Sequence, residues 1–119
     1  GADGGGGGEG KSMATSQPSS QKVSYDEKRF KDTDWPYLAE AVARSPTLKE
    51  LSLNGTGMGD VGATELGKAL KTNKSVRHLL MRANNIGDVG AKGLAAGLKY
   101  NDTLQVLDLD GNNIGDEGR

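Results

Sequence analysis

Apolar residues recur in the same order three times along the chain, with the same number of residues between repeats. Leu48, Val76 and Leu104 lie 28 residues apart, and each opens a segment with apolar residues at its first, fourth and sixth positions. The fourth and sixth positions alternate with other residues at a period of two, which predicts a short strand with one buried face. A fixed period of this size indicates a stacked array of structural units rather than one closed globule.

Apolar residues at helical spacing follow each of the first two strands. The expected buried faces comprise Val61, Leu66, Ala69 and Leu70 in one helix, and Val89, Leu94 and Leu98 in the next. We expect Asp60, Asp88 and Asp116 to cap helix N-termini, because a carboxylate accepts hydrogen bonds from backbone N–H groups that lack partners there. Asn73 and Asn101 are expected to end the helices in a left-handed turn.

The N-terminal part of the chain departs from this pattern. Residues 1–20 are rich in Gly, Ser and Gln and contain few apolar residues, so we expect a disordered tail. Residues 21–47 match the repeat loosely, with Tyr25, Phe30 and Trp35 in place of smaller residues. We interpret this segment as a cap or a degenerate first repeat, because the end of an array has only one neighbour to pack against.

The predicted domain therefore covers residues 21–119. Its units are the cap at 21–47, repeats at 48–75 and 76–103, and a partial repeat at 104–119. The third strand is followed by Asp116 and then by the end of the chain at Arg119. We expect this chain to be a fragment of a longer array, since the helix of the third unit would follow there.

The repeated pattern resembles the ribonuclease-inhibitor-like leucine-rich repeats. Its positions in the last unit are Leu104, Leu107, Leu109, Asn112, Ile114, Gly115, Asp116 and Gly118. The resemblance implies an α/β solenoid in which parallel strands line a concave face and helices form the convex face. Thr56 stands where the later units have Asn84 and Asn112, and a hydroxyl forms fewer hydrogen bonds than an amide.

Composition and charge remove several classes of function. The formal net charge of −1 provides no general attraction to nucleic acid or to an acidic membrane surface. The sequence has no cysteine, which excludes disulfides, zinc–thiolate sites and cysteine nucleophiles. It also lacks an apolar run of about 18 residues and a signal-peptide pattern, so we expect no membrane association and a cytoplasmic location.

Several motifs match known functional patterns but have simpler explanations. Residues 5–12 match the phosphate-loop pattern G-x-x-x-x-G-K-[ST], without the strand and helix that such a loop needs. Asn54, Asn73 and Asn101 begin glycosylation sequons, and the last two recur with the repeat. His78 is the one histidine and has no pattern of catalytic partners. We therefore expect no catalytic residues, no metal site and no cofactor.

The outward-facing strand positions are the candidate functional residues. They vary between the repeats whereas the buried positions do not, as expected of a partner-binding surface and equally of a neutral solvated one. The predicted contacts to a partner are Glu50, Arg77, His78, Leu80, Arg82, Asp108 and Asp110. Leu80 is the most informative of these, because an outward apolar side chain on a concave sheet calls for a partner.

The predicted function is a non-catalytic module that binds a protein on its concave strand face. The resemblance leaves two regulatory alternatives open, a fragment of a Ran-type GTPase-activating protein and the sensing arm of a NOD-like receptor. Such folds host many roles, so fold alone does not choose between them. The identity of the partner and the oligomeric state stay open.

Overall fold

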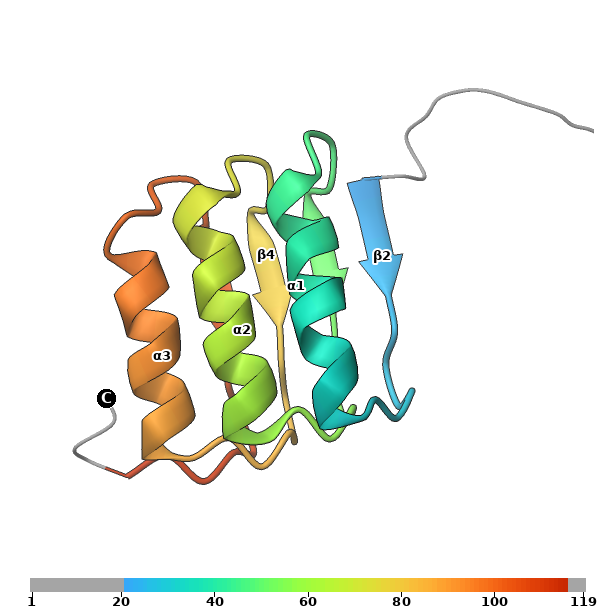
Figure 1. Ribbon diagram of the computed structural model, residues 1–119, viewed down its shortest axis with the longest axis vertical. Coiled ribbons are helices and arrows are strands. Elements are labelled where there is room, and N and C mark those ends of the chain that lie inside the picture. Colours follow the sequence, from blue (N-terminus) through green and yellow to red (C-terminus); the bar gives the residue numbers. More distant parts are fainter. Residues whose placement is uncertain (1–20, 116–119) are drawn as a thin grey trace, which may run out of the picture.

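The computed structural model describes residues 21–115 and shows one layer of strands packed against one layer of helices (Figure 1). The strands are β2 (Lys22–Ser24), β3 (Glu50–Ser52), β4 (His78–Leu80) and β5 (Val106–Asp108). The helices are the 3-10 helix η2 (Asp32–Asp34) and the α-helices α1 (Trp35–Arg44), α2 (Gly59–Thr72) and α3 (Asp88–Leu98). The expected α/β solenoid is confirmed. The predicted tail at 1–20, its phosphate-loop pattern and the Asp116 cap lie outside the described residues.

The described strands form a parallel sheet in the order β2-β3-β4-β5. Val23 pairs with Leu51, Leu51 with Leu79 and Leu79 with Leu107, so each residue lies beside the residue 28 positions further along the chain. The sequence period is therefore also the register of the sheet. Because a parallel connection needs a crossover, one helix follows each of the first three strands, and all three helices cover the same side of the sheet (Figure 1).

The core lies between the two layers and is closed at its N-terminal end by aromatic rings. Leu51, Leu79 and the other inward strand residues contact the apolar faces of the helices. Trp35 at the start of α1 is fully buried, and the ring centroid of Phe30 lies 5.0 Å from that of Trp35. The ring of Tyr25 stands edge-on to Phe30, with 5.9 Å between centroids. These large side chains cover the end of the core, where no preceding repeat packs.

The predicted buried faces of the helices are wrong at two positions. Val61 and Val89 are 45% and 67% exposed, whereas Gly62, Ala63 and Gly90 are buried. The helices pack so closely that the inner positions accept only small residues; a Cβ at Gly62 would overlap the side chains of Met58 and Trp35. Hydrophobicity placed the valines inside, but available volume decided which residues face the core.

The expected helix caps are also wrong, because the side chains involved bond to the next repeat. Asp60 lies within α2, and its Oδ1 accepts hydrogen bonds from the backbone N–H groups of Gly87 and Gly90, at 2.7 and 3.0 Å. Asp88 likewise accepts from the N–H of Gly115, at 2.7 Å. Each aspartate therefore caps the start of the following unit instead of its own helix.

Asn73 does not adopt the predicted left-handed turn either. Its backbone is extended (φ −68°, ψ 134°), and its side chain is buried. The amide Nδ2 donates to the carbonyl oxygens of Val42 and Ser45, while Oδ1 accepts from the N–H groups of Ser75 and Val76. This asparagine therefore joins the end of α1 to the turn before β4, and its amide nitrogen is buried rather than presented for glycosylation.

Asn84 and Asn112 make a second series of bonds between neighbouring units. The buried Asn84 accepts from the N–H of Thr56 at 2.8 Å and donates to the carbonyl of Leu53 at 2.8 Å. Asn112 accepts in the same way from the N–H groups of Asn84 and Ile86, at 2.9 and 3.0 Å. The hydroxyl of Thr56 instead lies 2.9 Å from both the Leu53 carbonyl and Asn84 Oδ1.

We predict that Asn84→Ala lowers the free energy of unfolding by about 2–4 kcal/mol, because it leaves a buried N–H and a buried carbonyl with fewer partners. Urea denaturation followed by circular dichroism measures this loss. Asn113→Ala is the matched control, since the Asn113 side chain is exposed and makes no hydrogen bond within the described residues. Equal stability of the two variants would contradict the role given to Asn84.

Glycines allow α2 and α3 to approach each other closely. A Cβ at Gly97 would overlap the backbone carbonyl oxygen of Gly67, and one at Gly67 would overlap that of Gly93. The three glycines thus occupy the line along which the two helix backbones meet.

We predict that Gly97→Ala destabilises the domain by about 2 kcal/mol, because the added methyl group forces the two helices apart. Helix propensity alone would give the opposite sign, a gain of about 0.5–1 kcal/mol. The sign of the change in thermal unfolding temperature therefore distinguishes the two effects, and a stabilised variant would contradict the close packing of the helices.

Candidate functional site

The candidate site is the side of the sheet that faces away from the helices, which we call the strand face. The strand register aligns its residues in rows across the repeats. Two rows lie within the strands, namely Lys22–Glu50–His78–Val106 and Ser24–Ser52–Leu80–Asp108. The third row, Asp26–Asn54–Arg82–Asp110, follows two residues after the strand ends. The alternating direction of side chains along a strand explains why these positions share one face.

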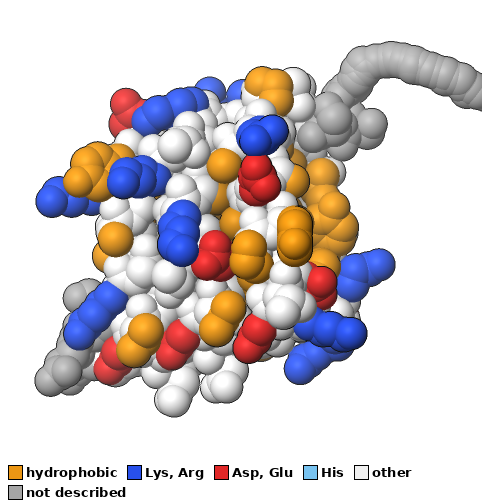
Figure 2. Space-filling model, in the orientation of Figure 1, with side chains coloured by type: hydrophobic (Ala, Val, Ile, Leu, Met, Phe, Trp, Pro, Cys, Tyr) orange, Lys and Arg blue, Asp and Glu red, His pale blue; other side chains and the backbone are white. Residues whose placement is uncertain are grey.

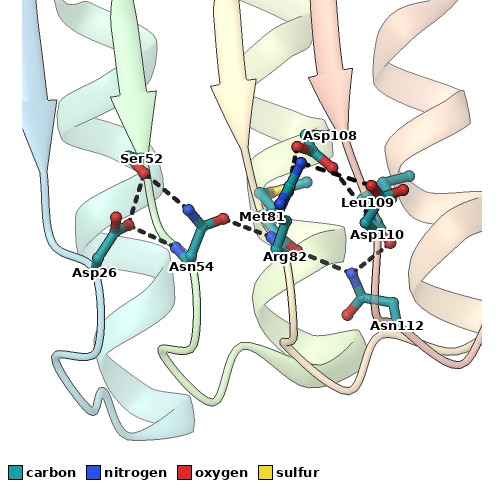
Figure 3. A network of polar contacts seen from close by, with 9 residues as sticks. All are labelled: Asp26, Ser52, Asn54, Met81, Arg82, Asp108, Leu109, Asp110 and Asn112. Carbon is teal, nitrogen blue, oxygen red and sulfur yellow. Dashed lines mark hydrogen bonds and ion pairs between the residues drawn. The ribbon is translucent and has the colours of Figure 1, made fainter.

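Arg82 holds the acidic end of the strand face together (Figure 3). Its Nε donates to Asp108 Oδ2 at 2.5 Å, and its terminal nitrogen lies 3.7 Å from Asp110 Oδ2. The hydrogen bond from Arg82 lowers the pKa of Asp108, and the same bond raises the pKa of Arg82. The guanidinium is thus oriented by two carboxylates from the neighbouring repeat, so its position is set before any partner binds.

Polar contacts continue from Arg82 across the other repeats. The backbone N–H of Arg82 donates to Asn54 Oδ1 at 2.7 Å, and Asn54 Nδ2 donates to Ser52 Oγ at 3.2 Å. Ser52 in turn donates to Asp26 Oδ1 at 2.6 Å, and this bond is the main reason that the pKa of Asp26 is lowered. Figure 3 shows these groups as a chain of contacts across β2, β3, β4 and β5.

The row at the start of the strands contains a second polar cluster. Glu50 lies between two basic groups, with Lys22 Nζ at 3.6 Å and His78 Nδ1 at 3.3 Å. Val106 completes this row and is 45% exposed, although it belongs to the apolar residue types. Leu80 lies beside Ser52 and Asp108 in the next row and is half-buried. The strand face therefore combines accessible apolar surface with fixed charges.

The structure brings most of the predicted partner-binding residues together. Glu50, His78, Leu80, Arg82, Asp108 and Asp110 lie on the strand face in adjacent rows. Arg77 precedes β4, and its side chain makes no contact with either polar cluster among the described residues. That these residues bind a partner stays a prediction.

Three residues of the strand face were not among the predicted contacts, although the 28-residue spacing could have identified them. Asp26 and Ser52 occupy the same rows as Asp110 and Leu80 and complete the polar chain. Val106 was left out because a valine in a strand is usually a buried residue. Only its place at the end of the sheet leaves it exposed.

The described residues offer no cluster of three or more His, Asp or Glu side chains that could hold a metal ion. None of the helices within residues 21–115 is long and apolar enough to cross a membrane. The recurring aspartates are accounted for by the caps that they provide to neighbouring units. The chemistry of the strand face is therefore that of ion pairs, hydrogen bonds and apolar contact.

We predict that Ser52→Ala raises the pKa of Asp26 toward its ordinary value, because it removes the strongest bond to the carboxylate. A lowered pKa in the folded protein stabilises it above the unfolded pKa, and this stabilisation is lost as pH falls below about 4. Carboxyl-carbon NMR titration measures the pKa directly. Ser24→Ala is the matched control, since Ser24 is the weakest contributor, and an equal rise in both variants would contradict the assignment.

Comparison with family models matches the chain to a model described as "Leucine Rich repeat" at residues 44–67, 72–95 and 100–119. These three matches begin 28 residues apart and together cover more than half of the sequence. Among curated proteins, none matches the sequence significantly.

Among solved structures, one of "Leiomodin-1 Actin-Binding Site 2 (ABS2)" is similar, with a TM-score of 0.78 and 22% sequence identity. The alignment covers 86% of this chain and 61% of that chain, so the sequence spans about three-fifths of the length of that structure. At this identity the likeness shows the fold.

Proposed function

The chain belongs to the leucine-rich repeat family, and we propose that it is a non-catalytic module that binds a protein partner on its strand face. The observation that carries the proposal is the alignment of unlike side chains on a sheet surface that the helices leave uncovered. A surface with a purely structural role has no need of Leu80 and Val106 at accessible positions beside fixed charges.

The ion pairs of the strand face support binding because they reduce the cost of ordering the surface. Side chains that become fixed only on binding lose conformational entropy at that moment. Arg82 is already held by Asp108 and Asp110, and Glu50 by Lys22 and His78. Such a surface presents charges in set positions, which favours selection of one partner over others.

The strand face gives no particular support to the two regulatory alternatives. An arginine that stabilises charge during GTP hydrolysis has to reach the nucleotide, whereas Arg82 is held by two carboxylates of its own chain. A Ran-type activator would accelerate hydrolysis by a small GTPase in a turnover assay. A receptor arm would be joined to a nucleotide-binding domain in its gene product. The ribonuclease-inhibitor-like subtype likewise remains part of the proposal.

We predict that Leu80→Ser combined with Arg82→Asn weakens partner binding about tenfold, equivalent to about 1.4 kcal/mol. These substitutions introduce the residues that the preceding repeat carries at the same positions, Ser52 and Asn54, so the fold accommodates them. The measurement is quantitative affinity capture with mass spectrometry, and co-sedimentation with filamentous actin tests the partner that the structural neighbour's name suggests.

The matched control is Val89→Ser combined with Arg44→Asn, which makes the same kinds of change on exposed residues of the helix layer. The control should retain every partner that the unmodified chain captures. Partners lost equally from both variants, or retained by the strand-face variant, would contradict binding through the strand face.

A further inference from the structure

A groove of about 250 Å³ lies on the other side of the molecule, between α2 and α3. Its lining is formed by Thr64, Gly67, Lys68, Lys71, Gly93, Ala96, Gly97 and Tyr100. The floor is the line of glycines along which the two helices meet. Because these residues lack side chains, the space above them stays open, and the longer side chains of neighbouring helical turns form its walls.

Positive charge gathers at the end of this groove, around an exposed aromatic ring. Tyr100 is 54% exposed, and the ammonium groups of Lys71 and Lys99 lie 5.1 and 5.8 Å from its ring centroid. Within residues 21–115, neither of these two lysines forms an ion pair with a carboxylate, whereas Lys68 pairs with Glu65 and Lys74 lies 3.8 Å from Asp102. Figure 2 shows basic side chains gathered around an apolar side chain over the C-terminal ends of these helices.

We propose that the groove between α2 and α3 binds an acidic peptide segment of a partner protein, with a carboxylate at Lys71 and Lys99. An apolar side chain next to that carboxylate lies over the glycine floor and against Tyr100 and Ala96. Charge complementarity selects the acidic groups, and the apolar lining of the groove selects the neighbouring side chain. This surface is separate from the strand face, so the two sites can be occupied at the same time.

The chemistry of the groove favours a peptide over a phosphate-bearing ligand. Phosphate sites commonly use arginine or several converging backbone N–H groups. The lining of this groove has no arginine, and the N–H groups of its glycines lie inside helices, where they bond within the helix. The formal net charge of −1 also gives the chain no general attraction to a polyanion.

The test is titration of the isotope-labelled protein with a short fluorescent peptide in which glutamates flank a leucine. Amide NMR shifts should concentrate on residues 64–71 and 93–100, and anisotropy should give the dissociation constant. Lys71→Glu combined with Lys99→Glu should raise this constant about tenfold or more, since attraction becomes repulsion. Ala96→Gln, which fills the groove without changing its charge, should also weaken binding.

Lys28→Glu combined with Lys31→Glu is the matched control, because it reverses two exposed charges in the loop before α1 and should leave the affinity unchanged. The same peptide with glutamine in place of glutamate should bind at least about tenfold more weakly. The proposal is overturned if the glutamate peptide does not bind, or if its shifts map to the strand face. Equal or tighter binding of single-stranded DNA or of phosphatidylserine vesicles would also overturn it.

Discussion

The structure depends on buried asparagine and aspartate side chains that bond to the neighbouring repeat. Asn84 and Asn73 are almost fully buried, and each donates and accepts hydrogen bonds across the boundary between units. Buried backbone groups need partners, and a strand of three residues supplies few of them. Side chains spaced 28 residues apart supply the rest, so adjacent units can stack in only one register.

That register makes the strand face a defined surface. Because unit follows unit without a shift, Arg82 meets Asp108 and Asp110, and Glu50 meets Lys22 and His78. A displacement by one residue would turn these side chains into the core and bring Leu79 to the surface. The same stacking brings α2 and α3 together along their glycines and leaves the groove above them, so both proposed binding surfaces follow from the repeat.

Much of the fold could be predicted from the sequence because its signals are local and repeated. The apolar positions of the strands and the order of strand and helix follow from periodicity within one unit, and register follows from the period itself. The errors at Val61, Asp60 and Asn73 share one cause. Each prediction considered the residue within its own helix, whereas the neighbouring repeat provides its volume limit or its hydrogen-bond partner.

By itself, the sequence determined the repeat, the strand positions, the rows of the strand face and the absence of thiol chemistry. These depend on residue type and spacing, which a single chain displays directly. Only the tertiary structure decided that Asp60 caps the next unit, that Val106 is exposed and that Lys71 and Lys99 meet at Tyr100. These outcomes arise from distances between residues of different units, and such distances exist only once the units have stacked.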